Sequence, residues 1–325
     1  MNVEPQPGPL DHPNVCVAVV VLYHPVRERL AQALRALSNQ VAAVVVYDNT
    51  TERFASQRPL NEPELQSLLG SGCRLTLLGS GHNMGLAAGL NRGIQSALDT
   101  GATHVLLLDQ DSVAAPGMVA ALLEGSQVAQ THGLHVAAAG PSFSDTRGVV
   151  PPPFLRVGFP TCRAVYPQPG DVYVRTDVLI TSGSLLGAQA IRDIGPMAES
   201  LFIDNVDIEW GFRAKAAGWA LIGVPAALLN HQLGEQRMPA PWWLRWTGRA
   251  HLIHHPPVRL YYIMRNRLAL QRLPHVPLAW KLQDLLRLPW RFLLGLQSAK
   301  SKPEAFRAMA QGLWHAVVGR SGPRP

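Results

Sequence analysis

The sequence predicts an α/β fold, with a mostly parallel sheet flanked by helices and a helical region at the C-terminal end. Short apolar runs rich in β-branched residues, the first at Val15–Leu22, are typical of central parallel strands. Segments with helical spacing, the first at Val26–Ser38, alternate with these runs, and this order favours a doubly wound sheet. From Pro239 onward only helical periodicity remains, in pieces interrupted by prolines.

The same two patterns define each expected element in turn. Strands are expected at 15–22, 41–47, 74–78, 103–108, 134–139, 172–180 and 219–224. Helices are expected at 26–38, 86–98, 118–131, 188–194 and 206–217. Residues 141–170 contain three consecutive prolines, which predicts a mobile insertion or a loop that covers an active site. The expected organisation is a disordered Pro-rich tail (1–14), a main domain (15–238) and a basic helical region (239–325).

The composition is that of a globular chain with a full core. Of the 325 residues, 47% are hydrophobic and 16% are charged. No basic and apolar leader opens the sequence, and no uncharged apolar run is long enough to span a membrane. Cys16, Cys73 and Cys162 lack metal-binding spacing and are too few for a disulfide framework, which favours a reducing, cytosolic compartment.

The charge is distributed unevenly along the chain. Residues 1–239 carry 15 Lys and Arg against 20 Asp and Glu, a net charge of −5. Residues 240–325 carry 14 against 2, a net charge of +12. A tail this basic needs an anionic partner, namely a membrane surface, a phosphate-bearing lipid or a nucleic acid. No nucleic-acid-binding motif accompanies the charge, so a nucleic acid is not expected.

Three segments of the basic region mix aromatic residues with arginine, at 241–246, 259–267 and 285–294. Helices of this composition suit the headgroup layer of a membrane, where Trp and Tyr lie at the interface and Arg binds anionic lipid. The alternative is a helical subdomain that packs on the main domain and exposes a basic outer face. The two interpretations are compatible.

The segment Val105-Leu-Leu-Leu-Asp-Gln-Asp-Ser112 carries the first candidate site. Its apolar residues predict a buried strand, and in an open α/β sheet the ligand crevice lies outside the carboxyl ends of the strands. Alternation along a strand points Asp109 and Asp111 to one side and turns Gln110 away. Because two adjacent carboxylates repel, a divalent cation is the expected partner. The alternative is a polar turn that caps the following helix.

Other strand ends also carry polar groups. Tyr23-His24 follows the first strand and Asp48-Asn49 follows the second, and Asp48 could bind a nucleoside or simply form a turn. After the third strand, Gly79–Gly85 leads into a helix whose small residues allow close packing on the sheet and whose amides could face a diphosphate. Arg92 on that helix is either a phosphate ligand or a solvated residue. A Rossmann fingerprint does not follow the first strand, which disfavours a dinucleotide oxidoreductase.

A second carboxylate cluster opens the helix expected at 206–217. Asp204 is suited to the helix N-cap, and Asp207 lies near the first turn. A carboxylate kept near neutral charge by Arg213 would be a general base facing a sugar hydroxyl. The alternative is a capped helix with an internal ion pair. Farther along the chain, His231 follows the last expected strand, where a lone histidine is usually not a ligand.

Taken together, these motifs resemble the inverting GT-A glycosyltransferases of family 2, and among them bacterial rhamnosyltransferases. The resemblance covers about residues 15–235, with every motif in the family's order. The motifs are Tyr23-His-Pro25, Tyr47-Asp-Asn49, Asn83-x-Gly-x-x-x-Gly-x-Asn-x-Gly93, Leu108-Asp-Gln-Asp-Ser112, Thr181-Ser-Gly-Ser184, the run from Phe202 to Arg213, and His231-x-Leu-Gly234.

The resemblance implies a role for each matching position. Asp48 would contact the nucleobase, and Asp109 and Asp111 would hold Mg²⁺ or Mn²⁺ on the donor diphosphate, with His231 as a further ligand. Asp207 would be the general base. The remaining nucleotide-binding positions would be Tyr23, Asn83, Gly85 and Arg92, and the acceptor side would include Ser182, Gly183, Asp204 and Arg213. The family's usual acidic residue before the base is Val206 here, and a carboxylate stands instead at Asp204.

The implied function is inverting transfer of L-rhamnose from dTDP-rhamnose to a glycan or lipid-linked acceptor during synthesis of cell-surface polysaccharide. The enzyme would work in the cytoplasm, at the inner face of the membrane. One alternative is a galactofuranosyl or other hexosyl transferase of the same fold. A non-catalytic nucleotide-sugar or membrane-binding module is a further alternative, which the presence of a metal pair and a base candidate disfavours.

Overall fold

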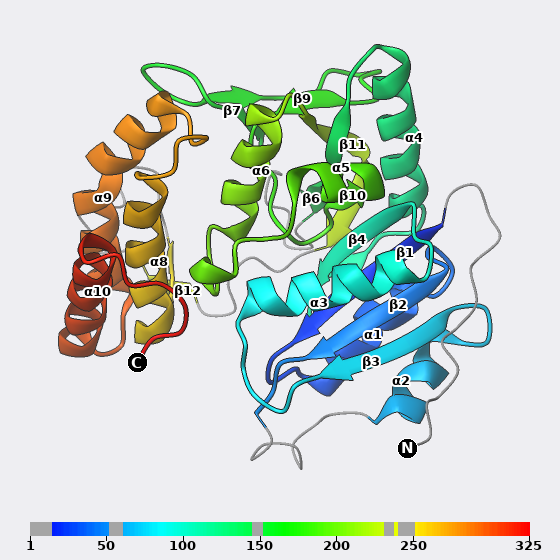
Figure 1. Ribbon diagram of the computed structural model, residues 1–325, viewed down its shortest axis with the longest axis horizontal. Coiled ribbons are helices and arrows are strands. Elements are labelled where there is room, and N and C mark those ends of the chain that lie inside the picture. Colours follow the sequence, from blue (N-terminus) through cyan, green and yellow to red (C-terminus); the bar gives the residue numbers. More distant parts are fainter. Residues whose placement is uncertain (1–14, 52–60, 145–151, 231–236, 240–250) are drawn as a thin grey trace.

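The computed structural model describes residues 15–51, 61–144, 152–230, 237–239 and 251–325. The tail at 1–14, expected to be disordered, lies outside these ranges. Figure 1 shows a central sheet with helices on both faces, and the helices of the C-terminal region packed at one side. The predicted mixed α/β architecture with a C-terminal helical region is confirmed.

The sheet of the described residues has nine strands. Eight lie in the order β3 (Arg74–Gly79), β2 (Ala43–Asp48), β1 (Cys16–Leu22), β4 (His104–Asp109), β10 (Leu185–Gly187), β6 (Val136–Ser144), β11 (Ala220–Asn230) and β5 (Val113–Ala114). The ninth strand, β9 (Val174–Thr176), pairs with β11. Strands β1 to β4 are mutually parallel, and β6 is parallel to β11. The short strand β10 runs antiparallel between β4 and β6, so the sheet is mixed but mostly parallel.

Alternation along the strands builds a core on each face of the sheet. On β1, Val17 and Val19 pack with helices α3 (Leu86–Asp99), α5 (Ala188–Ile194) and α6 (Val206–Ala216). Ala18 and Val20 pack on the opposite face, with helices α1 (Arg27–Leu37), α2 (Glu62–Leu69) and α4 (Met118–Thr131). Both faces of β1 are therefore buried, which is why its sequence is continuously apolar.

Several elements differ from the expectation. Helix α2 had not been expected; Asn61 and Glu64 form a capping box at its start. The strand expected at 172–180 is reduced to β9, because Asp177 leaves the sheet to accept the N–H of Val157 and to pair with Lys215. The described part of the insertion at 141–170 contains the end of β6 and a hairpin, β7 (Phe154–Arg156) with β8 (Arg163–Val165).

The C-terminal region begins with strands rather than with helices alone. Strand β12 (Arg237–Pro239) pairs antiparallel with β13 (His251–Ile253), and helices α8 (Pro257–Leu270), α9 (Leu278–Ser298) and α10 (Lys302–Val317) follow. Trp280 of α9 meets Phe212 of α6 edge to face, with ring centroids 5.5 Å apart. The helices thus pack on the main body. None of the described helices is long and apolar enough to cross a bilayer.

Helix α8 corrects one sequence interpretation. The segment 259–267 had been expected at a membrane surface, yet Tyr261, Arg265 and Asn266 of this helix are 0%, 1% and 0% exposed. Their side chains face the main body and α10 because the polar groups find partners there. The alternative, a helical subdomain packed on the main domain, therefore describes α8. The segment 241–246 lies outside the described residues.

Candidate active site

The carboxyl ends of the parallel strands bring the first candidate residues to one edge of the sheet. Asp48, at the end of β2, is in register with Leu22 of β1 and with Gly79 of β3. Asp109, at the end of β4, is in register with Val21 of β1. The edge predicted from the strand ends is therefore formed by adjacent strands, where ligands of open α/β sheets bind.

Two buried serines support the turn that carries Asp109 and Asp111. The main-chain N–H of Asp109 donates to Ser182 Oγ at 3.1 Å, and Ser182 Oγ donates to Ser112 Oγ at 2.8 Å. Both serines are almost fully buried. Ser182, expected on the acceptor side, therefore supports the aspartate turn. Its neighbour Gly183 has a φ of +84°, and a Cβ there would lie 2.5 Å from Pro141 Cγ, so a tight turn requires glycine.

The side chain of Gln110 points away from the carboxylates, as expected from alternation. The N–H of Tyr23 donates to Gln110 Oε1 at 2.8 Å, and Gln110 Nε2 donates to the carbonyl oxygen of Tyr23 at 3.1 Å. These two bonds fix the end of β4 against the end of β1. The Tyr23 side chain itself is 49% exposed, at the rim of the site.

The electrostatics of Asp109 show which carboxylates surround it. Burial, together with the negative charges of Asp111 and Asp207, raises the pKa of Asp109 to about 7, although Arg259 opposes the rise. Hydrogen bonds link Asp207 to the same turn across 98 residues of sequence, because Asp207 accepts the N–H of Thr181 and the next residue, Ser182, accepts the N–H of Asp109. Clustered carboxylates of this kind repel one another in the metal-free protein, and a bound cation would relieve that repulsion.

The donor set fits Mg²⁺ or Mn²⁺. Both ions prefer oxygen ligands, and Asp109 and Asp111 present carboxylates on one turn. In the part of the chain that the structure describes, no third His, Cys, Asp or Glu completes a ligand group with them. His231, the expected further ligand, lies outside the described residues. The two aspartates would leave coordination positions for substrate oxygens and water, as is usual for Mg²⁺.

Asp207 lies in the first turn of α6, where the helix dipole favours a negative charge. Its Oδ2 accepts the N–H of Thr181 at 3.1 Å, and its Oδ1 accepts the N–H of Ile208 at 2.8 Å. Burial raises the pKa of Asp207, and these two main-chain donors partly offset the rise. A carboxyl group with a raised pKa is a stronger proton acceptor near neutral pH than an ordinary aspartate.

The segment before α6 has an unusual backbone. Phe202, Asp204 and Asn205 have φ angles of +65°, +63° and +62°, a region that side chains other than glycine rarely adopt. Asn205, rather than the expected Asp204, is the N-cap of α6, and it makes no side-chain capping bond. Local propensity therefore does not explain this conformation, and packing from elsewhere must hold it.

Helix α8 supplies that packing. The Asn266 side-chain amide donates to the carbonyl oxygens of Leu201, Ile203 and Asp204, at 2.9, 2.6 and 2.9 Å. Arg265 donates to the carbonyl oxygens of Ser200 and Leu201, at 3.2 and 2.8 Å. Sequence reasoning missed both residues. A polar pair inside an otherwise apolar helical run was the available signal, since buried polar groups need partners.

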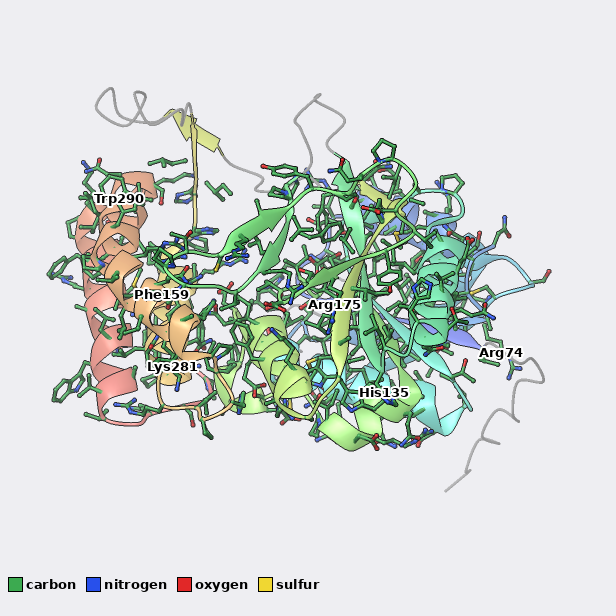
Figure 2. The ribbon with its side chains drawn as sticks, turned by 90° about the horizontal axis from the view of Figure 1, so that it is seen from above. Arg74, His135, Phe159, Arg175, Lys281 and Trp290 are labelled. Atoms are coloured by element: carbon green, nitrogen blue, oxygen red, sulfur yellow. The ribbon has the colours of Figure 1, made fainter. Side chains whose placement is uncertain are left out.

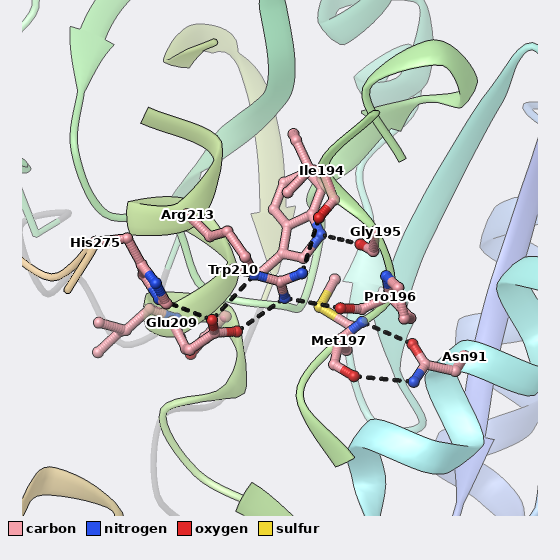
Figure 3. Close-up of polar contacts among 11 residues, drawn as sticks. Asn91, Ile194, Gly195, Pro196, Met197, Glu209, Trp210, Arg213 and His275 are labelled. Carbon is pink, nitrogen blue, oxygen red and sulfur yellow. Dashed lines mark hydrogen bonds and ion pairs between the residues drawn. The ribbon is translucent and has the colours of Figure 1, made fainter. Parts of the chain in front are cut away.

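Asp204 and Arg213 both have partners other than the expected ones. Asp204 accepts from Arg259 of α8, whose Nε and Nη2 lie 3.2 and 3.1 Å from its Oδ1. Arg213 binds Glu209 through Nε and Nη2 at 3.0 and 2.9 Å, and it also donates to the carbonyls of Ile194 and Pro196. Figure 3 shows this network, with His275 on the other side of Glu209. The internal ion pair weighed as the alternative for Arg213 is thus present.

The loop before α3 packs against the same segment. Asn83 Oδ1 accepts the N–H of Gly85 at 2.9 Å, and a Cβ on Gly85 would lie 2.6 Å from the ring of Phe202. The N–H of Ala87, at the start of α3, donates to the carbonyl oxygen of Phe202 at 3.2 Å. That amide is therefore used within the protein and does not point at a diphosphate. Arg92 lies on the exposed side of α3.

Asp48 is buried behind this loop and also forms a turn. Its Oδ1 accepts the N–H of Thr50 at 2.9 Å, and its side chain is 5% exposed. The next residue, Asn49, ties the two loops together: it donates to the carbonyl of Gly85 and accepts the N–H of Met84. The predicted turn is thus present, and Asp48 still stands at the edge expected to bind a nucleoside.

A cavity of about 400 Å³ lies at the opposite edge of the sheet, where β4 and β6 begin. Thr103, Val136 and Trp219 are among its lining residues, and none of the predicted site residues lines it. Because ligands of such sheets bind at the carboxyl ends of the strands, the aspartate edge remains the candidate active site.

The chain is 28% identical to dTDP-rhamnosyl transferase RfbF of Shigella flexneri over 306 residues, 94% of this chain and 96% of that protein. No family model matches the chain.

Two solved structures share the fold at low sequence identity. The structure of GalNAc-T7 with UDP, GalNAc and Mn²⁺ has a TM-score of 0.53 and 13% identity; the match covers 86% of this chain and 56% of GalNAc-T7. Mannosyltransferase PcManGT from Pyrobaculum calidifontis, in complex with GDP-Man and Mn²⁺, has a TM-score of 0.52 and 14% identity, over 97% of this chain and 79% of that one. The fold of this chain is that of the GT-A glycosyltransferases.

Proposed function

We propose that this chain, a homologue of a dTDP-rhamnosyl transferase with the GT-A glycosyltransferase fold, transfers L-rhamnose with inversion from dTDP-rhamnose to a saccharide hydroxyl. The single observation that carries the proposal is the link between Asp207 and the Asp109–Asp111 turn: Asp207 accepts the N–H of Thr181, and the next residue, Ser182, accepts the N–H of Asp109. A donor at the sheet edge and an acceptor beside α6 would meet between these carboxylates.

On the donor side, Asp109 and Asp111 would hold Mg²⁺ or Mn²⁺. The cation, when bound, supplies positive charge to the diphosphate of the departing nucleotide. The nucleoside would lie over the ends of β1 and β2, near Tyr23 and Asp48. Ser182 and Gln110 keep the aspartate turn in place, so the carboxylates do not have to reorganise when the donor binds.

On the acceptor side, Asp207 accepts the proton of the attacking hydroxyl. The hydroxyl oxygen forms a bond to the anomeric carbon while the bond from that carbon to the diphosphate oxygen breaks, and the electron pair leaves with the nucleoside diphosphate. Attack from the face opposite the leaving group inverts the anomeric carbon. One base suffices for this single displacement, unlike the paired carboxylates of glycoside hydrolases.

We propose further that the acceptor is a saccharide carried on a lipid and that the enzyme works on an anionic membrane surface at the cytoplasmic side. Helix α9 supports this, because Leu278, Leu282 and Leu286 are spaced by four residues and are 70%, 42% and 82% exposed. Lys281 and Arg287 lie beside them in the sequence. Figure 2 shows Lys281 and Trp290 among the C-terminal helices, at the end of the molecule away from the sheet.

The proposal is tested by donor turnover with the purified protein. dTDP-rhamnose, UDP-galactofuranose, UDP-hexoses and GDP-mannose are supplied with and without Mn²⁺, and release of the nucleoside diphosphate is measured. We expect release of dTDP from dTDP-rhamnose and no release of nucleoside diphosphate from the other donors. Release from another donor would mean that the sugar of that donor, and not rhamnose, is transferred. If no donor is turned over even with a lipid-linked saccharide present, the proposal that this chain is a glycosyltransferase fails.

A further inference from the structure

Arg259 is a cation of the C-terminal region that stands at the candidate active site. It lies in the first turn of α8, and its side chain is 48% exposed. Its Nε and Nη2 both donate to Asp204 Oδ1, at 3.2 and 3.1 Å. Within the described residues no acceptor is bonded to Nη1, so one edge of the guanidinium is held by Asp204 and the other is open.

The charge of Arg259 reaches the donor edge as well as the acceptor segment. Its partner Asp204 lies three residues before Asp207, whose Oδ2 accepts the N–H of Thr181, and the next residue, Ser182, accepts the N–H of Asp109. These bonds tie the segment that Arg259 contacts to the aspartate turn, and the charge of Arg259 accordingly opposes the rise in the pKa of Asp109. It also lowers the pKa of His255, which follows β13. Arg259 therefore stands between the end of β4 and the segment that precedes Asp207.

A charge count shows what this cation would do. Asp109 and Asp111 share one turn, Asp207 is linked to that turn through Thr181 and Ser182, and Asp204 lies three residues before Asp207. A divalent cation and Arg259 together carry three positive charges against these four carboxylates, and a nucleotide sugar adds a diphosphate with two more negative charges. The cation therefore does not balance the carboxylates and the diphosphate together, and a basic side chain facing the diphosphate would reduce the excess negative charge.

Nearby basic residues are already engaged elsewhere. Arg213 is bonded to Glu209, Lys215 to Asp177, and Arg265 to the main-chain carbonyls of the segment before α6. Arg92 lies on the exposed side of α3. Of these described cations, Arg259 combines an open edge with a position near Asp109.

We propose that Arg259 binds the diphosphate of the nucleotide donor and stays with it as the nucleoside diphosphate leaves. This inference rests on the proposed function and extends it to the C-terminal region. The planar fork of arginine can hold Asp204 with one edge and phosphate oxygens with the other, which the ammonium of lysine cannot do. Since Asp204 lies three residues before Asp207, the same side chain links the leaving group to the segment that carries the base.

The experiment measures calorimetric binding of dTDP, UDP and GDP with Mn²⁺, using the full chain. For the nucleotide that wild-type protein binds most tightly, Arg259→Ala is expected to weaken binding by roughly tenfold to a hundredfold, the effect of a charge-assisted hydrogen bond. Arg259→Lys should lose less. The matched control is Arg307→Ala, which removes an exposed arginine from α10 and should change nothing.

Asp204→Asn separates phosphate binding from a merely structural role. It removes the partner of Arg259 and one negative charge, so it should leave diphosphate binding unchanged or strengthen it. A loss equal to that of Arg259→Ala would overturn the inference, as would unchanged binding in Arg259→Ala. Should Arg259→Ala not fold, Arg259→Lys and Asp204→Asn decide by the same measurement. If wild-type protein binds none of the three nucleotides, the proposed function fails together with the inference.

Discussion

The side-chain amide of Asn266 donates to the main-chain carbonyl of Asp204 across 2.9 Å, and so joins α8 to the segment that precedes the proposed base, Asp207. The same amide reaches the carbonyls of Leu201 and Ile203. A strained backbone at Asp204 and Asn205 persists only where the surroundings hold it. Helix α8 therefore helps to fix where α6 begins, and with it the position of the proposed base Asp207.

Replacing Asn266 by alanine is expected to reduce stability and activity together. The part-buried carbonyls of Ile203 and Asp204 would lose this donor, whereas the carbonyl of Leu201 keeps Arg265. The cost is about 1 to 3 kcal/mol for each group left unsatisfied, with solvent and relaxation reducing the sum. Thermal unfolding and turnover number are the measurements. Gln271→Ala, at the C-cap of the same helix, is the control, since among the described residues the Gln271 side chain donates only to the carbonyl oxygen of Arg267. A fully stable and active Asn266→Ala protein would show that the segment holds its own conformation.

Asp207→Asn tests the base directly. The amide keeps the size of the side chain and an oxygen for one of the two N–H donors, but it cannot accept the proton of the acceptor hydroxyl. The turnover number should fall by about 10² to 10⁴, with donor binding nearly unchanged. Asp193→Asn is the control, because Asp193 is exposed on α5 and bonds only to Gln189 among the contacts described. If Asp207→Asn turned over as fast as the wild type, another residue would have to be the base.

Because the pKa of Asp109 is raised, replacing this residue by a neutral one should increase the stability of the protein by an amount that depends on pH. The folded-state pKa of about 7 lies above the ordinary value of 3.8, so the favourable contribution of the protonated form is complete below pH 3.8. It is lost as the pH rises through about 7. Asp109→Asn should therefore raise the melting temperature of metal-free protein more at pH 8 than at pH 5, and change it little below pH 3.8. Equal shifts at both pH values would contradict the assignment.

Removal of divalent cations should abolish transfer and leave the fold intact. Asp109 and Asp111 supply only oxygen ligands from one turn, so a chelator is expected to strip the cation easily. Donor turnover should stop with excess chelator and return with added Mn²⁺ or Mg²⁺, while circular dichroism remains unchanged. Asp111→Asn should require more metal for half-maximal turnover. Full turnover in chelator would mean that leaving-group charge is neutralised by the protein alone.

The strands and the aspartate edge could be predicted from the sequence because their causes are local. Continuous apolar runs predict β1, β2 and β4, and parallel pairing places Asp48 and Asp109 at the same edge. The partner of Arg213 could also be predicted, because residues four apart meet on one face of a helix, as Glu209 and Arg213 do. Asp207 is six residues from Arg213 and therefore lies on a different side of the helix.

The contribution of α8 could not be predicted in the same way. Asn266 and Arg259 follow Asp204 by more than fifty residues, and a polar residue in a helix reads equally well as solvated or as bonded to a distant backbone. Residue type also does not show whether Asp204 or Asn205 is the N-cap of α6, since both Asp and Asn are favoured at that position. Tertiary contacts decide both cases.

The exposed leucines of α9 predict where the protein meets a membrane. Leu282→Glu with Leu286→Glu should reduce sedimentation with phosphatidylglycerol vesicles at low salt, because burial of apolar side chains in the interface is replaced by charge that the anionic lipid repels. Val26→Glu places the same charge on an exposed apolar position beside α1, distant in sequence from the basic region, and should bind as wild type does. Phosphatidylcholine vesicles should bind both proteins weakly, since the net charge of +12 in residues 240–325 then has no anionic partner. Wild-type protein that stays in the supernatant with anionic vesicles would contradict the membrane-surface proposal while leaving the transfer reaction untouched.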